Sequence, residues 1–135
     1  MSPHPNAIRI RQIYQALGAG DVGAVLEGFA ADTLFHMPGS GELAGDHKGR
    51  DGVAKVVTHL MGISGGTMAF EVHGVYADAD HAAVHLRETA TRAADGAVLD
   101  VEEVHLLALD ADGRIREFWD LPADPDAHNG FFEGR

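Results

Sequence analysis

The sequence predicts an α+β fold in which a curved, mostly antiparallel sheet wraps over three N-terminal helices. Two observations lead to this prediction. Apolar residues before Gly65 recur mostly at helical spacing, whereas those after it alternate as in strands. Helices followed by a run of strands favour an α+β fold over a parallel α/β sheet. A sheet that curves around helices leaves a cavity between them, so the fold suits a small-molecule site.

Two helices are expected near the N-terminus. Residues 1–6 contain two prolines and are expected to form a loose arm. Apolar residues at helical spacing predict the first helix over residues 7–17. Asp21 follows two glycines and is well placed as the N-cap of a second helix over residues 22–30, since its side chain can accept a hydrogen bond from a free backbone amide.

A short strand, a loop and a third helix follow. The strand is predicted over residues 33–37 and ends at a Pro-Gly pair. Residues 38–49 hold four glycines and one proline, which predicts a loop with several turns. We expect Asp51 to cap the third helix, whose apolar stripe ends at the glycines around Gly65.

Strand patterns dominate the second half of the chain. Alternating residues predict strands over residues 68–76 and 82–91, and a hairpin over residues 97–121. The hairpin turn, residues 110–113, contains Asp, Ala, Asp and Gly, which suit a tight turn. Residues 122–135 form an acidic, turn-like tail that Phe131 and Phe132 could anchor to the body or to a partner.

Composition narrows the functional classes. The 135 residues suit one domain, residues 1–135, and the formal net charge of −11 opposes nucleic acid and anionic membranes as partners. The absence of cysteine excludes disulfides, thiolate metal sites and cysteine nucleophiles. No apolar signal segment or membrane-length run is found. We therefore expect a cytoplasmic protein with neither nucleic acid nor membrane as partner.

The hairpin carries the candidate chemistry. Alternation places Glu103 and His105 on one face of its first strand, and Arg116, Phe118 and Asp120 on one face of its second. Neither face of the first strand is purely polar, so we expect both faces to be covered. A carboxylate beside an imidazole can fix its tautomer and raise its basicity, which predicts His105 and Asp120 as an acid–base pair.

The same residues could instead have purely structural roles. His105 could be a buried histidine whose hydrogen bond to a carboxylate serves stability alone. Asp120 could merely cap the turn before Pro122. Glu103 either adds a third ionisable group to the cavity or lies on the surface. His36 is expected to be a structural histidine bonded to the glycine-rich loop.

No metal or cofactor is expected. His73 and His85 could join His105 in a metal triad, but no known ligand spacing supports it. The loop at residues 38–50 lacks a phosphate-binding pattern and is expected to form a pocket rim. The residues expected to line the cavity and contact a substrate are Tyr14, Leu17, Phe35, Met37, Met61, Phe70, Glu103, Leu107 and Phe118.

Three stretches of the chain carry a resemblance to known proteins: Tyr14–Asp21 with Phe29–Asp32, Phe35–Gly39 with Leu43–Asp51, and Asp112–Asp120. Together with the order of the expected helices and strands, these stretches resemble the NTF2-like superfamily. Within it the chain is similar to SnoaL-like proteins, a group that includes polyketide cyclases and relatives of ketosteroid isomerase. The resemblance implies a cone-shaped fold and a homodimer paired through the sheet.

The resemblance favours cyclase-like over isomerase-like residues. Isomerase relatives place a proton-shuttling aspartate where this chain has Met37, and an oxyanion-binding tyrosine where it has Ile13. The cyclases resemble this chain at His105 and Asp120, which implies an acid–base role for these two residues.

We therefore expect a cofactor-independent enzyme of the cyclase, isomerase or lyase type that acts on a small hydrophobic carbonyl compound. The alternative is a non-catalytic protein that binds a small molecule in the same cavity. A pure dimerisation module would have no cavity at all.

Overall fold

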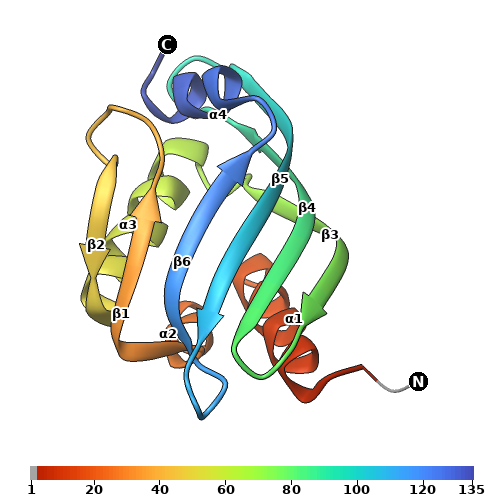
Figure 1. Cartoon of the computed structure of the whole chain (residues 1–135). Helices are drawn as coiled ribbons and strands as arrows, with labels where there is room; N and C mark the ends of the chain where they lie inside the picture. The colour runs from red at the N-terminus through yellow and green to blue at the C-terminus, as the bar shows by residue number, and fades with distance from the viewer. Residues whose placement is uncertain (1–2) are drawn as a thin grey trace.

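The computed structural model describes residues 3–135 and confirms the α+β fold (Figure 1). One six-stranded sheet has the order β2-β1-β6-β5-β4-β3, with β1 and β6 parallel and all other neighbours antiparallel. The strands are β1 Phe29–Met37, β2 Gly45–Lys48, β3 Ala69–Ala77, β4 His81–Thr91, β5 Val98–Leu109 and β6 Ile115–Pro122. The helices are α1 Pro5–Gly18, α2 Val22–Glu27, α3 Gly49–Ser64 and α4 Pro125–Phe132.

The first two helices differ from the sequence prediction at their ends. Helix α1 begins at Pro5, and Asn6 is buried, so the expected arm is confined to the residues before Pro5, of which 1–2 lie outside the described residues. Proline suits a first helical turn because the amide it lacks would have no partner there. Asp21 caps α2 as expected, but the helix ends at Gly28 and the chain enters β1 at once.

The predictions for the third helix and for the loop before it were also partly wrong. Asp51 is not the cap: α3 begins at Gly49, and Asp51 lies in its first turn, where a negative charge suits the helix dipole. The helix ends as expected, with Gly65 at a left-handed φ of 58°. The predicted loop contains the short edge strand β2, which pairs with β1 and has too few residues for a sequence pattern.

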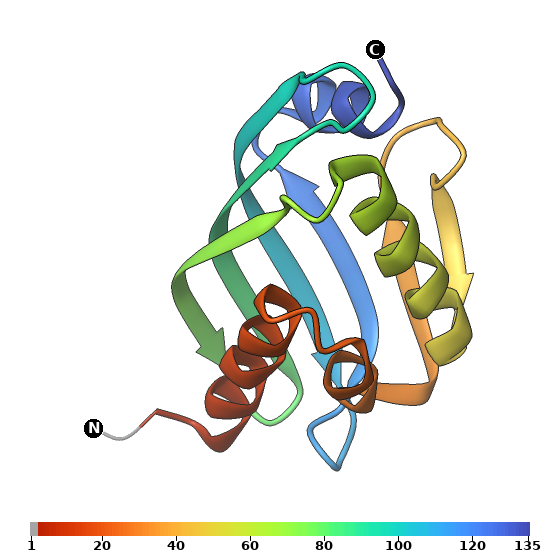
Figure 2. The same cartoon turned by 180° about the vertical axis from the view of Figure 1, so that it is seen from behind.

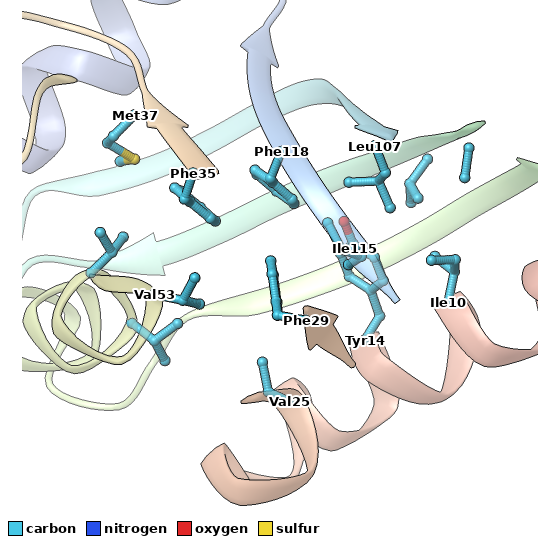
Figure 3. Packing of buried hydrophobic residues seen from close by; sticks show 14 of the residues in the cluster. Ile10, Tyr14, Val25, Phe29, Phe35, Met37, Val53, Leu107, Ile115 and Phe118 are labelled. Atoms are coloured by element: carbon cyan, nitrogen blue, oxygen red, sulfur yellow. The ribbon is translucent and has the colours of Figure 1, made fainter. Parts of the chain in front are cut away.

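The core lies between the concave face of the sheet and helices α1, α2 and α3, which Figure 2 shows from behind. Aromatic rings from neighbouring strands stack there: the centroids of Phe35 and Phe118 are 4.3 Å apart (Figure 3). The convex face has no such cover in residues 3–135, since Val98, Val104, Leu106 and Leu121 are exposed. The expectation that both faces of the hairpin strand are covered is therefore wrong for the single chain.

The predicted faces of β6 were wrong because this strand contains a β-bulge. The β5–β6 pairing shifts register between Ala108 and Leu109, so that Arg116 lies between the paired residues Ile115 and Glu117. Ile115 and Phe118 are therefore both buried, while Arg116 is exposed. A bulge of one residue reverses the alternation on one side of it.

The tail is not turn-like but forms α4, which lies across one end of the sheet (Figure 1). Asp124 caps this helix by accepting a hydrogen bond from the Ala127 amide. Phe131 is buried against Leu99 and Val101, which confirms the predicted anchor to the body. Across residues 3–135, no helix combines the length and apolar composition needed to cross a membrane.

Candidate active site

Strand register brings the two predicted chemical residues together. His105 on β5 and Asp120 on β6 are directly paired across the antiparallel ladder, so their side chains share the concave face. His105 Nε2 lies 3.4 Å from Asp120 Oδ1, and both side chains are buried. Oδ1 of Asp120 accepts no hydrogen bond from any described residue.

Tyr14 holds the other nitrogen of the imidazole. Its hydroxyl lies 2.5 Å from His105 Nδ1, and the two rings are stacked with centroids 5.8 Å apart. Burial raises the pKa of Tyr14, so its hydroxyl stays protonated at neutral pH. Helix α1 thus supplies a phenol to the histidine, one residue after the position that the family resemblance indicated.

Glu103 completes the hydrogen bonding of His105. Its Oε2 lies 3.0 Å from His105 Nε2, and the residue is only 1% exposed. The alternative that Glu103 lies on the surface is therefore wrong. Period-two geometry places Glu103 beside His105 on the same face, and α4 covers the strand end that was expected to be solvated.

Two further titratable residues belong to the cluster and were missed from the sequence. His128 of α4 places its Nε2 3.1 Å from Glu103 Oε1 and 3.3 Å from Asp120 Oδ2. Glu88 of β4 lies beyond it, with Oε2 3.7 Å from the same nitrogen. Nothing in the pattern of the acidic tail indicates that His128 is buried. Alternation along residues 82–91, in contrast, places Glu88 on the same face of the strand as the buried Val84 and Leu86.

The charges of the cluster balance. Burial opposes a charge on either histidine, but their partners raise the pKa of His105 well above its ordinary value and that of His128 to about 11. For Glu103 and Asp120, burial acts to raise the pKa, and the bonds to these imidazoles lower it overall. Burial and the Glu103 carboxylate raise the pKa of Glu88 well above the ordinary range. At neutral pH the cluster thus holds two imidazolium ions, two carboxylates and one neutral carboxyl group.

An internal cavity opens beside this cluster, with about 70 Å³ available to the centres of water-sized molecules. That is room for several waters. Most of its wall is apolar, and it is bounded by α1, α2, α3 and the concave face of the sheet. Its polar residues are Tyr14, Glu88, His105, Asp120 and His128.

The expected lining residues divide into two groups. Those that line the cavity are Tyr14, Leu17, Phe35, Met37, Phe70 and Phe118. Met61, Glu103 and Leu107 do not line it: helix α3 presents Leu60 instead of Met61, Glu103 lies behind His105, and Leu107 is fully buried in the core. A pure dimerisation module was expected to have no cavity. The presence of this cavity therefore argues against that alternative.

The remaining histidines lie away from the cavity. His36 bonds Asp46 at 2.7 Å and Glu117 at 2.6 Å, which confirms a structural bond to the glycine-rich loop. His73 and His85 lie on the convex face, so the considered triad with the inward His105 does not form.

Two sets of buried donor atoms lie close enough together to consider a metal. They are Glu103 with His105 and Asp120, and Glu88 with Glu103 and His128. In both sets the imidazole holds a proton on the nitrogen that faces the carboxylates, because its pKa is raised. A metal ion at either set would have to displace this proton from the imidazole.

The comparisons with known proteins agree with the fold. The SnoaL-like domain family matches residues 10–118, which include most of the sheet and the site residues Tyr14, His105 and Phe118. The chain belongs to the SnoaL-like domain family. No curated protein matches this SnoaL-like chain.

Solved structures resemble this SnoaL-like chain over most of its length. Bal32a, from a soil-derived mobile gene cassette, is 30% identical with a TM-score of 0.87, covering 94% of this chain and 95% of its own. TerC, co-crystallised with polyporic acid, is 22% identical with a TM-score of 0.83, covering 96% and 99%. IdmH, a proposed polyketide cyclase from Streptomyces antibioticus, is 21% identical with a TM-score of 0.73, covering 89% and 93%. The last two likenesses establish the fold alone.

Proposed function

We propose that this SnoaL-like chain is a cofactor-independent acid–base enzyme acting on a small hydrophobic carbonyl compound. The observation that carries the proposal is Asp120 Oδ1, which is buried at the wall of an apolar cavity, lies 3.4 Å from His105 Nε2 and accepts no hydrogen bond from the described residues. An ionised carboxylate with a free lone pair is a competent base once a substrate excludes water from the cavity.

The proton path follows from the hydrogen bonds. Asp120 Oδ1 takes a proton from the carbon next to the substrate carbonyl, which becomes an enolate. His105 is protonated, so its Nδ1–H donates to the oxygen of Tyr14 and leaves the Tyr14 O–H free to donate to the enolate oxygen. A hydrogen bond in a dry site stabilises such developing charge far better than it would in water.

Two reactions of the enolate would return Asp120 to its ionised form. In a cyclisation, the enolate carbon attacks a second carbonyl of the same molecule, and the resulting alkoxide takes the proton back from Asp120. In an isomerisation, Asp120 returns the proton to a different carbon. The cyclisation is favoured because this chain lacks the isomerase residues at Ile13 and Met37, and IdmH, a fold relative, is a proposed polyketide cyclase.

The homodimer and the cytoplasmic location inferred from the sequence stay predictions. Apolar side chains on the convex face, Val104, Leu106 and Leu121 among them, are exposed in the single chain and offer a surface on which a second copy could pack.

Deuterium exchange tests the proposal without knowledge of the natural substrate. Small enolisable ketones such as 2-tetralone are incubated with the protein in D2O, and loss of the α-proton signal is followed by NMR. We expect catalysed exchange that falls by about 10²- to 10⁴-fold in Asp120→Asn. Asp100→Asn removes an exposed carboxylate of the same hairpin and should leave the rate unchanged.

Two results would oppose catalysis. Equal exchange in wild type and Asp120→Asn would exclude Asp120 as the base. Binding of the ketone, seen as shifts of the Tyr14 and Phe118 signals, without any exchange would favour the alternative of a non-catalytic binding protein.

A further inference from the structure

The convex face of the sheet carries two histidines and one glutamate that the proposed function does not use. His73 on β3, His85 on β4 and Glu102 on β5 come from three neighbouring strands. Glu102 Oε2 lies 3.2 Å from His73 Nε2 and 3.1 Å from His85 Nε2. The two imidazole rings have centroids 4.8 Å apart and are tilted by 57° to each other.

A β-bulge marks the position of His73. The β3–β4 register shifts between Val72 and Gly74, so that both His73 and Gly74 lie opposite His85. Only His73 brings a side chain to this place, and a Cβ at Gly74 would stand 2.8 Å from the hydroxyl of Tyr76. Bulges redirect side chains and are enriched next to functional sites.

The distances match a metal site. Zinc bonds to histidine nitrogen and carboxylate oxygen are about 2.0–2.2 Å long, so neighbouring ligand atoms of a tetrahedral site lie about 3.3–3.5 Å apart. The two carboxylate–imidazole distances are already close to this value, and all three donor atoms lie within 4.8 Å of one another. The side chains of His73, His85 and Glu102 are 32%, 50% and 49% exposed, so small rotations can close the remaining gap.

The charges nearby favour a cation. Arg87 lies directly opposite Glu102 on the neighbouring strand, but its guanidinium is bound by Asp100, with Nε 2.7 Å from Oδ1, and also lies 4.0 Å from Glu71. Three carboxylates thus surround one guanidinium next to the two histidines. The formal net charge of −11 further attracts cations to the protein.

We propose that His73, His85 and Glu102 bind one divalent transition-metal ion of the zinc type. Two neutral imidazoles and one carboxylate supply three ligands and leave the fourth position open. The ion ties β3, β4 and β5 together on the face opposite the cavity.

Zinc titration of the metal-free protein by isothermal calorimetry at pH 7.5 tests this site directly. We expect one zinc ion per chain in wild type, and binding at least about tenfold weaker in His73→Gln and in His85→Gln. His81→Gln is the matched control, because His81 is exposed on the same strand and face as His85, and its zinc affinity should equal that of wild type.

Three results would overturn the site. They are the absence of saturable zinc binding, equal affinity in wild type and the two variants, and loss of binding only in His105→Gln, which would place the ion inside the protein. All three substitutions on the convex face replace exposed side chains, so the variants are expected to fold. Because zinc itself is the probe, the result does not depend on whether the cavity is catalytic.

Discussion

Replacing His128 with glutamine removes one of the two cations of the buried cluster. His128 is 1% exposed, and its Nε2 lies within 3.3 Å of both Glu103 and Asp120. Glutamine keeps a polar side chain at this place but cannot carry the charge. The variant therefore leaves two buried carboxylates with His105 as their remaining charged partner.

The expected cost is large. Removing one member of a buried ion pair costs about 3–5 kcal/mol of unfolding free energy, because the other member stays buried without compensation. For a chain of this size, such a loss lowers Tm by about 10–20 °C. The folded pKa of His128, about 11, lies above its unfolded value of 6.5, so the stabilisation is complete below about pH 6.5 and is lost as pH rises toward 11.

Urea unfolding of wild type and His128→Gln at pH 6 and pH 9 measures both effects. The stability difference should be largest at pH 6 and clearly smaller at pH 9, by up to about 1.4 kcal/mol for each pH unit above 6.5. His59→Gln, on a partly exposed face of α3, is the control and should change stability by no more than about 0.5 kcal/mol. An equal loss at both pH values would refute the electrostatic role and leave only packing.

Three further substitutions test the core, a turn and the site. Leu107→Ala removes a fully buried side chain and should cost about 2–5 kcal/mol in urea unfolding, with the m-value unchanged. Gly65→Ala places a Cβ at a left-handed φ, 3.2 Å from Ala93, and should lower Tm through a cost of about 1–2 kcal/mol. Tyr14→Phe keeps the ring but removes the hydroxyl that contacts His105, so ketone exchange should slow at least about tenfold while ketone binding persists.

Much of the fold could be predicted because its local patterns agree with its tertiary packing. Helical spacing in α1 and α3, and alternation in β4 and β5, follow directly from which side chains the core buries. Strand β2 could not be predicted, since four residues of Gly, Asp, His and Lys are held by pairing with β1 rather than by an apolar pattern. The bulge at Arg116 also escaped, because only the partner strand defines where register shifts.

The site was predictable where strand register decides it. Alternation and the hairpin were enough to place His105 and Asp120 on one face of the two strands, and the bulge at Arg116 sets them directly opposite each other. His128 was not predictable, because its burial depends on where α4 docks, and docking is set by Phe131 contacting strands far away in the sequence. The alternative that Glu103 lies on the surface was wrong for the same reason, because the docked α4 covers Glu103.

The NMR titration of the His105 imidazole, in wild type and in Asp120→Asn, tests most directly whether these two residues form a coupled pair. We expect wild-type His105 to keep its proton well above its ordinary pKa, and removal of the neighbouring anion to lower this pKa. His105 and His128 signals are assigned by comparison with His128→Gln. A His105 titration near its ordinary value, unchanged by Asp120→Asn, would contradict the acid–base pair on which the proposed function depends.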